Sequence, residues 1–526
     1  MEHPRESKII RTLAQRPRWA VFTASAALGY LALQTTLSLA PLVGLLALLF
    51  TAAHDVRAKQ PNAAAPAVLW ACITLGATIA RISPSLTALS TPLGAVVLSA
   101  VMSGVSVAAA MLLVNVAVWS HGLYGWAGLC TFPTIWTGLG WLESTTPLGR
   151  LLSWTPLKGS GMYEWIMPYI GPSALDWITA AWAVVFAELI LYTSPVEELE
   201  DLEPYADDPN VGAPIEEAEI PRRHVPKLAV LLVALAIPSL IVNPFHQSTP
   251  PAERNSTRLP VDPLDRYIDE SKNFTSNGRL LLWPEGAVTV HSAEQRIAMF
   301  QKINDTLTGR QQRTWIAVSY IEPSRAQGKQ RNAVTVFGSK GELFTYYKRN
   351  LVPLVESYSQ ITEDKPPEVH QLPLDVNPPG KNRGSHDIHG VALSAGICLD
   401  FASSFPALSQ KPALILAPAN TWHAEIGEAM AAHARLRARE LATHVLWCDG
   451  GAGGRSALFG PEGDVVYQVG GGSWLATLDM PYPFEERRSA YGVLGSTIPV
   501  GLMCLLLPFL PLLAGAAISV TAPMGK

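Results

Sequence analysis

Long runs of apolar residues constrain the fold of this chain more than any other feature of its sequence. A helix needs about 20 apolar residues to cross the hydrocarbon core of a bilayer. Seven blocks meet or approach that length before a polar region begins, and an eighth follows that region. The blocks cover Trp19–Thr36, Leu39–Ala53, Pro66–Ala80, Pro92–Trp119, Leu123–Leu142, Ser173–Tyr192 and Pro226–Val242, and then Val493–Val520. This pattern predicts a polytopic α-helical membrane domain of seven spans plus one.

The composition agrees with this prediction. Of the 526 residues, 48% are hydrophobic and only 16% are charged, whereas soluble proteins carry about 25% charged residues. The net charge of −4 argues against a basic protein that binds nucleic acid. The five cysteines are scattered and form no CxxC or His/Cys cluster, which argues against a zinc site or a disulfide scaffold. We therefore expect no metal, no cofactor and no nucleic-acid partner.

Basic residues set the expected orientation, because cytoplasmic loops of membrane proteins carry an excess of Lys and Arg. They gather at the N-terminus, after the second apolar block and after the sixth. These three places share one side of the membrane if seven spans precede the polar region. The residues are Arg5, Lys8, Arg11, Arg16 and Arg18, then Arg57 and Lys59, then Arg222, Arg223 and Lys227. We expect cytoplasmic termini and a polar region outside the cytoplasm.

Three units follow from these boundaries. Residues 1–243 are predicted to form the membrane domain, 244–490 an extracytoplasmic domain, and 491–526 a C-terminal spanning helix. An acidic loop over residues 193–225 lies within the first unit. Its composition is typical of a solvated, partly disordered cytoplasmic loop, and an acidic partner-binding segment is the alternative.

The polar region alternates short β-type runs with helical stretches, which indicates an α/β layered domain. Most of these runs are apolar at nearly every position, as strands buried on both faces tend to be. The predicted strands are Arg279–Trp283, Trp315–Tyr320, Ala333–Phe337, Val391–Cys398, Ala413–Ala417, His444–Trp447 and Asp464–Val469, and the predicted helices include Ala293–Thr308 and His423–Ala442. In such folds the chemistry takes place in the loops beyond the strand ends.

Three predicted strand ends carry reactive groups. Glu285 in WPEGA follows one strand, and a partly desolvated carboxylate there could serve as a general base. Lys348 in YYKRNLVP could stabilise an oxyanion, and Glu356, eight residues later, could orient it. Cys398 in GICLD closes an apolar run and could act as a nucleophile, with Asp400 close behind. Taken singly, a turn carboxylate, a surface lysine or a core cysteine is the more common interpretation of each.

Together and in this order, the three segments resemble the Glu–Lys–Cys triad of the nitrilase, or carbon–nitrogen hydrolase, superfamily. Glu285 and Lys348 are 63 residues apart and Lys348 and Cys398 are 50 apart, which is also similar. The resemblance implies an α-β-β-α sandwich for the polar region. It also implies catalytic roles for these three residues, with a backbone amide near Leu399 completing the oxyanion site.

Within that superfamily, the seven spans before the domain and the one after it resemble apolipoprotein N-acyltransferase over nearly the whole chain. Glu356 lies in a segment similar to the LVPxxE of that family, and Asn332 lies in a similar strand before the lysine. The stretch from Trp136 to Glu143 resembles its aromatic and Glu segment in the membrane part. Ala419–Trp422 resembles its NDAW stretch, and Leu436–Glu440 its LRAxE helix. This resemblance suggests substrate-binding roles for Glu143, Asn420 and Trp422.

Departures from the pattern of that family mark a divergent member. The usual Cys-Tyr-Glu is Cys398-Leu399-Asp400 here, the usual Phe-Gly-Glu is Leu354-Val355-Glu356, and a glycine-rich run occupies Asp449–Gly454. These changes leave the triad intact. They fall around the expected pocket and leave the specificity for the acceptor open.

The resemblance implies a two-step acyl transfer. An acyl chain would pass from a membrane phospholipid, typically phosphatidylethanolamine, to Cys398 as a thioester, and then to an amine. In the family the amine is the N-terminal diacylglyceryl-cysteine of a lipoprotein. The catalytic domain would face the periplasm at a bacterial inner membrane. In a eukaryote it would face an ER-type lumen, where the Asn-X-Ser/Thr triplets at Asn255, Asn273 and Asn304 would suit glycosylation, although such triplets also arise by chance.

Two other classes stay open. A membrane-anchored amidase would pass the thioester to water and act on a small amide. A non-catalytic membrane scaffold with a decayed domain would need no intact triad. A transporter is disfavoured, because the apolar blocks hold few charged residues and no obvious inverted repeat.

Overall fold

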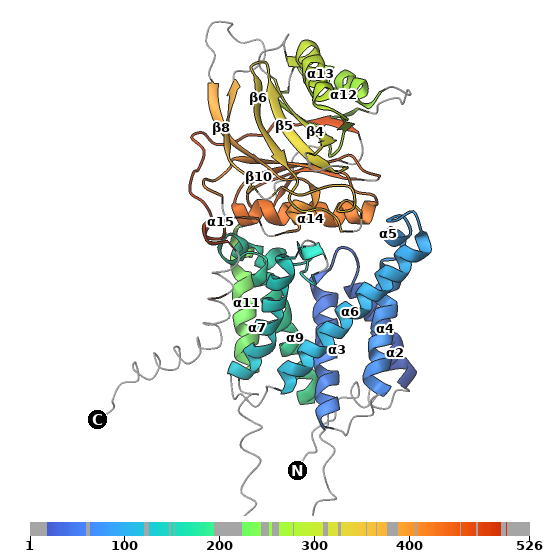
Figure 1. Ribbon diagram of the computed structural model, residues 1–526. Helices are drawn as coiled ribbons and strands as arrows, with labels where there is room; N and C mark the ends of the chain where they lie inside the picture. Colours follow the sequence, from blue (N-terminus) through green and yellow to red (C-terminus); the bar gives the residue numbers. More distant parts are fainter. Residues whose placement is uncertain are drawn as a thin grey trace, which may run out of the picture.

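The computed structural model places a helix bundle beneath an α/β domain (Figure 1). It describes residues 18–495 and residue 501. The residues left out of that range are 59–63, 120–125, 147–148, 152, 194–223, 243–251, 255–261, 277, 309–313, 325–327, 354, 364, 376–387, 404, 407, 453 and 470–471. The acidic loop lies almost wholly outside the described residues, as do Asn255 and nearly all of the eighth apolar block.

Each of the first seven apolar blocks contains a helix. These are α2 (Arg18–Ala32), α3 (Leu39–Ala58), α4 (Ala64–Ala80), α6 (Pro92–Trp119), α7 (Trp126–Ser144), α9 (Ser173–Thr193) and α11 (Val225–Val242). Within the described part of the chain, two helical segments are both long and apolar enough to cross a membrane, Pro92–Val118 and Ser173–Leu191. The first helix ends four residues earlier than predicted, because the chain turns at Leu33–Thr36 before α3 begins.

Small residues bring helices of the bundle together. At Gly76 of α4, a Cβ atom would lie 2.1 Å from the carbonyl oxygen of Ala26, and at Gly29 of α2 it would lie 2.6 Å from that of Ile73. The two backbones therefore touch where side chains are absent, which is how closely packed membrane helices meet.

Short elements link the helices on the side facing the α/β domain. They are α5 (Ile82–Leu86), η2 (Gly149–Leu151), η3 (Gly161–Ile166) and α8 (Met167–Ile170). The apolar blocks do not predict them, because they lie in the connections between blocks.

Two sheets form the α/β domain. The first, with five strands, has the order β2 (Leu280–Leu282), β4 (Trp315–Pro323), β5 (Gln330–Gly338) and β6 (Gly341–Tyr347), with β3 (Val288–Thr289) also paired to β4. The second, with six strands, has the order β12 (Val465–Val469), β11 (Ser456–Phe459), β10 (His444–Asp449), β9 (Leu414–Ala419), β8 (Ile388–Ala395) and β7 (His370–Asp375). A separate small pair joins β1 (Ala252–Arg254) to β13 (Ser473–Leu475).

The central strands β4, β5 and β9 are buried on both faces, as expected of the inner layers of a sandwich. On one face of the first sheet, Ile316, Val318 and Tyr320 of β4 share a hydrophobic core with Phe300 and Ile303. The last two belong to helix α13 (Ala293–Ile303), and helix α12 (Pro263–Lys272) borders the same core. The opposite face of this sheet packs on the second sheet, whose outer face is covered by helix α14 (Ala424–Leu441). The order is therefore α-β-β-α, as the resemblance implied. Two predicted boundaries were wrong: residues 304–308 form a π-helical turn, and Cys398 lies in the turn η6 (Cys398–Phe401), beyond the end of strand β8.

Helix α14 also forms the contact with the bundle (Figure 1). The guanidinium of Arg435 makes two hydrogen bonds of 2.7 Å to the carboxylate of Glu164 in η3. Lys158 pairs with Glu428 at 2.5 Å. Beside the start of α14, Trp422 donates its indole N–H to the carbonyl of Pro84 at 3.2 Å. The last short helix, α15 (Ala490–Leu494), packs against α14 and α8.

Candidate active site

The three predicted catalytic residues each follow the end of a strand. Glu285 comes three residues after β2, Lys348 directly after β6, and Cys398 three residues after β8. Strands β2 and β6 belong to one sheet and β8 to the other, so the site lies where the two sheets of the sandwich meet. The structure brings the three residues together, although they are far apart in the sequence.

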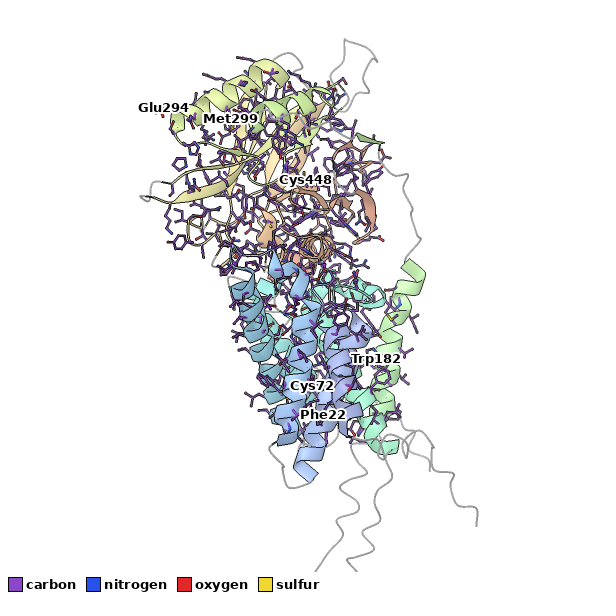
Figure 2. All side chains as sticks on the ribbon, turned by 90° about the vertical axis from the view of Figure 1, so that its right-hand side faces the viewer. Phe22, Cys72, Trp182, Glu294, Met299 and Cys448 are labelled. Atoms are coloured by element: carbon purple, nitrogen blue, oxygen red, sulfur yellow. The ribbon has the colours of Figure 1, made fainter. Side chains whose placement is uncertain are left out.

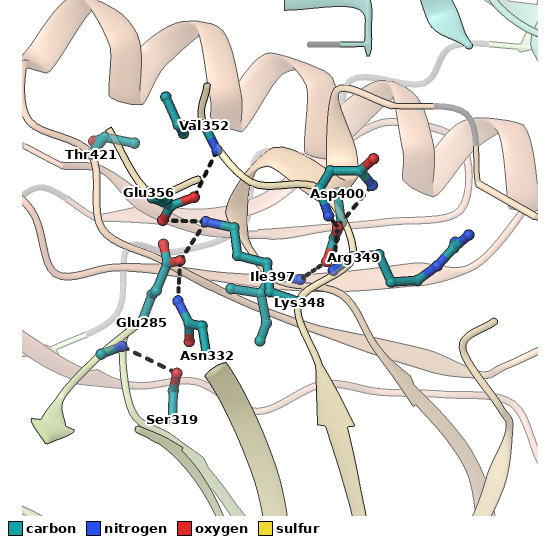
Figure 3. A network of polar contacts seen from close by, with 12 residues as sticks. Glu285, Ser319, Asn332, Lys348, Arg349, Val352, Glu356, Ile397, Asp400 and Thr421 are labelled. Atoms are coloured by element: carbon teal, nitrogen blue, oxygen red, sulfur yellow. Dashed lines mark hydrogen bonds and ion pairs between the residues drawn. The ribbon is translucent and has the colours of Figure 1, made fainter. Parts of the chain in front are cut away.

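Lys348 lies at the centre of the site, between two carboxylates (Figure 3). Its Nζ donates to Glu285 Oε1 and to Glu356 Oε1, each at 2.7 Å. The side chain of Lys348 is fully buried, and those of Glu285 and Glu356 are 5% and 18% exposed. The second oxygen of Glu356 accepts from the amide of Val352 at 2.8 Å. Glu356 therefore links Lys348 to the backbone at Val352, and its orienting role stays a prediction.

Glu285 is held by further contacts. The side-chain amide of Asn332 donates to Glu285 Oε1 at 2.7 Å, and the backbone amide of Glu285 donates to the carbonyl of Ala419 at 3.3 Å. Next to it, the amide of Gly286 donates to Ser319 Oγ at 3.2 Å. The sequence placed Asn332 in the strand before the lysine but gave it no role, and its contact depends on how β5 passes beside Glu285.

Cys398 has a backbone conformation that fits a reactive position. Its φ angle is +44°, in the left-handed region that residues other than glycine rarely adopt. Such strain persists only where the surrounding structure enforces it, and it is concentrated at functional sites. The thiol is hydrogen-bonded to Glu285 and to the backbone of Asn420. Glu285 therefore contacts both the lysine and the cysteine.

The charges of the three groups depend on one another. Burial raises the pKa of the Glu285 carboxyl above its usual value and outweighs the opposing effect of Lys348. Burial alone would lower the pKa of Lys348, but its acidic neighbours, above all Glu285, raise it above the usual value, so the ammonium group stays charged. Burial and Glu285 together hold the pKa of the Cys398 thiol well above its usual value. The raised pKa of the Cys398 thiol favours its neutral form, and Glu285 lies in position to accept its proton.

Asp400 connects the turn that contains Cys398, here called the cysteine turn, to the residues directly after Lys348, here called the lysine loop (Lys348–Val352). Its Oδ2 accepts from the amide of Ile397 and from the hydroxyl of Tyr346, both at 2.8 Å. Its Oδ1 accepts from the backbone and side-chain amides of Asn350, both at 2.9 Å. Asp400 is 3% exposed, so these bonds are buried. Asp400, predicted as a supporting residue, thus links two parts of the site, and its partners Tyr346 and Asn350 were not among the predicted site residues.

The other predicted site residues lie at different distances from this centre. Leu399 directly follows Cys398 in the turn and is buried. Asn420 is exposed and contacts the thiol through its backbone, and Trp422 reaches the bundle through Pro84. Glu143 lies in α7, where it borders a small cavity shared with Asp176 of the bundle. Substrate binding by Asn420, Trp422 and Glu143 stays a prediction.

A large cavity of the described structure lies away from the three catalytic candidates. It measures about 1180 Å³ and is lined by β2, by one face of the six-stranded sheet and by the segment 472–484. Cys448, inside the α/β domain (Figure 2), lies on its wall, and Glu285, Lys348 and Cys398 do not. Apolar side chains dominate this wall, whereas the triad gathers a base, a cation and a thiol. We therefore place the chemistry at the triad.

The described residues contain no group of three or more His, Cys, Asp or Glu side chains that could hold a metal ion. The cation of the site is the ammonium of Lys348, and the chemistry that the site can perform is nucleophilic: proton removal from a thiol, attack by sulfur, and stabilisation of an oxyanion.

The chain matches no protein-family model and no curated protein sequence. Among solved structures it is similar to an amidase from Nesterenkonia sp., at 19% identity and a TM-score of 0.31, over 41% of this chain and 84% of that one. It is also similar to a variant of that amidase in which acrylamide has added to the active-site cysteine, at 19% identity and a TM-score of 0.31, over 41% and 86% of the two chains. A third similar structure is a further variant in complex with butyramide, at 19% identity and a TM-score of 0.31, over 41% and 84%.

Proposed function

We propose that this chain is a membrane-embedded acyltransferase of the nitrilase superfamily, related to apolipoprotein N-acyltransferase. It takes an acyl chain from a phospholipid and passes it through a thioester on Cys398 to an amine. The observation that carries this proposal is the buried contact of Glu285, Lys348 and Cys398 in a domain that is fastened to an apolar helix bundle.

The first step uses the resting contacts of the triad. Glu285 takes the proton of the Cys398 thiol, and the sulfur attacks the ester carbonyl carbon of the phospholipid. The carbonyl electrons move to oxygen, which Lys348 and a backbone amide near Leu399 stabilise. When the intermediate collapses, the ester C–O bond breaks and the leaving oxygen takes the proton from Glu285. A lysophospholipid departs and a thioester remains.

In the second step an amine takes the place of the thiol as the nucleophile, and attack, proton transfer and collapse follow again. The amine nitrogen attacks the thioester carbon, Glu285 accepts a proton from nitrogen, and the C–S bond breaks. The sulfur then regains its proton and an amide is released. Because the ammonium of Lys348 stays charged throughout, it can stabilise the oxyanion of both steps.

Outward-facing apolar side chains support the membrane location of the bundle. Leu93, Val97, Val101, Val105 and Leu112 of α6 are each 55–77% exposed. Exposed apolar residues also occur on α4, α9 and α11. So wide an apolar surface is unfavourable in water and is expected of helices that face lipid. We propose that all seven helices span the bilayer, with the N-terminus in the cytoplasm and the α/β domain on the outer side.

The bundle also gives the reaction a physical advantage. Moving an acyl chain from the bilayer into water costs about 0.8 kcal/mol for each CH₂ group. A catalytic domain that is held at the membrane surface can receive the chain without exposing it. The contacts between α14 and the bundle hold the catalytic domain next to the proposed membrane surface.

The test is the mass of the protein after incubation with phosphatidylethanolamine in vesicles. We expect one acyl group to be added at Cys398, and none in Cys398→Ala. The matched control is Cys448→Ala, which removes the half-buried thiol of the same domain and should leave the adduct unchanged. If no phospholipid labels Cys398 while the protein hydrolyses small amides, the amidase alternative would replace this proposal.

A further inference from the structure

The turn that carries the nucleophile, Ile397–Ser403, is held at both of its ends. Asp400 fixes the N-terminal end through the amide of Ile397 and the lysine loop. Groups from outside the sheets hold the C-terminal end. The backbone amide of Arg150, in the bundle connection η2, donates to the carbonyl of Ala402 at 2.7 Å. A bundle residue thus contacts the turn that contains Cys398.

Gly149 allows that approach. A Cβ atom at this position would lie 2.6 Å from the carbonyl oxygen of Ala402 and 2.6 Å from the Cα of Ser403. Its φ angle of +55° also favours glycine. The backbone of η2 therefore rests directly on the end of the nucleophile turn, with no space for a side chain between them.

Arg437 of α14 reaches the same end of the turn. Its Nη2 donates to the carbonyl of Phe401 at 3.3 Å and also to that of Ser403. Its Nη1 forms an ion pair with Glu440, and the guanidinium lies 5.4 Å from the ring centre of Phe405. Arg437 is 3% exposed and Glu440 is 2% exposed. Arg437 therefore donates hydrogen bonds to two carbonyls at the end of the turn, and its ion pair with Glu440 holds the guanidinium in place.

A second buried arginine anchors the η2 contact within the bundle. The Arg150 guanidinium donates to Asp176 at 2.6 Å, to Thr155 at 2.9 Å and to Ser173 at 3.1 Å. Thr155 in turn donates to Asp176 at 2.7 Å. Because Asp176 and Ser173 belong to α9, the contact on Ala402 is connected to a helix of the proposed membrane domain.

We propose that Gly149, Arg150 and Arg437 are positioning residues that hold Cys398 in its left-handed conformation at the correct distance from Glu285 and Lys348. This inference rests on the proposed function in so far as Cys398 is the nucleophile. A strained residue keeps its conformation only while both flanks are fixed. The bundle is then part of the support of the nucleophile, in addition to being a membrane anchor.

The experiment compares Arg437→Gln with Arg435→Gln in the full chain in detergent. Both residues are on α14, and both form ion pairs of low exposure. Arg437 contacts the nucleophile turn, whereas Arg435 pairs with Glu164 on the bundle. Peptide mass spectrometry measures the rate at which iodoacetamide alkylates Cys398 across a range of pH. Thermal unfolding of each variant is measured in parallel, and all rates are taken well below its midpoint.

We expect Arg437→Gln to slow the alkylation of Cys398 by about tenfold or more, because a small misplacement of a reacting group has a large effect on rate. It should also alter the pH profile, since the thiol and Glu285 no longer meet. Arg437→Lys, which keeps the charge, should recover part of the rate. Gly149→Ala should slow alkylation as Arg437→Gln does, and Arg435→Gln should keep the wild-type rate and profile.

Equal alkylation of Cys398 in Arg437→Gln and Arg435→Gln would overturn the inference. So would wild-type alkylation in Gly149→Ala. This readout does not require phospholipid or amine. If the wild-type protein forms no acyl adduct while the alkylation rates differ as expected, the proposed function is wrong and the positioning role stands.

Discussion

At the scale of single residues, the titration of Glu285 depends on its burial and on the charges of its neighbours Lys348 and Glu356. Burial raises the pKa of Glu285 above 4.5, and the negative charge of Glu356 raises it further. Glu285 must be ionised to accept the thiol proton, so activity should fall as the pH falls through this raised pKa. The acid limb of the pH profile should therefore lie above the pH expected for an ordinary carboxyl group.

The substitution Glu356→Gln should have two effects. It removes a charge that raises the pKa of Glu285, so the acid limb of the rate profile should move to lower pH. It also removes a partner of Lys348, so we expect kcat to fall by about tenfold or more. Initial rates of lysophospholipid release across a pH series measure both effects. Glu363→Gln, which removes a carboxylate paired with Arg331 at 3.7 Å, is the control and should change neither. An acid limb that moves to higher pH in Glu356→Gln would contradict this account.

Asp400 offers a second test at this scale. In Asp400→Asn a neutral amide replaces a carboxylate that accepts from Ile397, Tyr346 and Asn350, and its NH₂ group faces donors. We expect the free energy of unfolding to fall by about 2–4 kcal/mol, because a buried network loses charge-assisted hydrogen bonds.

Chemical denaturation in detergent and the rate of acyl-enzyme formation should both show the Asp400→Asn defect. The control is Asp269→Asn, since Asp269 lies on the surface of α12 and pairs only with Lys272 among the contacts described. Wild-type stability in Asp400→Asn would show that the cysteine turn and the lysine loop are held together by other groups.

At the scale of elements, the packing of α2 on α4 depends on glycine. In Gly76→Ala the new methyl group would lie 2.1 Å from a backbone oxygen of α2, so the two helices must separate. We expect a loss of about 1–3 kcal/mol in stability. Gly138→Ala in α7 is the matched control, because a Cβ atom there meets nothing within 4 Å. It should be neutral or stabilising by up to about 1 kcal/mol, since alanine favours a helix over glycine. Thermal unfolding in detergent compares the two, and equal midpoints would contradict close packing at Gly76.

How far the sequence predicts these elements varies with their chemistry. Apolar blocks become helices because so long an apolar run has few other ways to satisfy its backbone. Strand β7 was not predicted, because Pro373 lies within it and polar residues alternate with leucines. For strand β6 only the end before Lys348 was predicted and not its extent, because polar residues interrupt its apolar pattern. Both are held by their neighbours in the sheets, which local patterns do not report.

In the candidate site, too, some residues could be predicted from local patterns and others could not. Glu285, Lys348 and Cys398 were predicted because each lies in a distinctive segment beyond a strand. The contact of Asn332 with Glu285 and that of Arg437 with the nucleophile turn arise only when distant segments meet. A single sequence holds no local signal for such contacts, and the same is true of Gly149 resting against Ala402.

At the scale of the whole molecule, the proposed topology places the α/β domain outside the membrane and the start of α11 on the cytoplasmic side. In a chain whose native cysteines are replaced, Asn273→Cys on the α/β domain should react with a membrane-impermeant maleimide in right-side-out vesicles. Lys227→Cys, at the start of α11, should react only after the vesicles are opened. Both positions are exposed in the structure, so a difference reports the side of the membrane. Labelling of both positions in sealed vesicles would contradict the proposed orientation.

The fate of the acyl chain tests the central claim most directly. The purified protein in vesicles is loaded from phosphatidylethanolamine with a labelled acyl chain, and a peptide with an N-terminal diacylglyceryl-cysteine is then added. The account predicts label on Cys398 that moves to the peptide amine, with no labelled product in Cys398→Ala. Label that leaves Cys398 as free fatty acid, at the same rate with and without the peptide, would contradict acyl transfer to an amine.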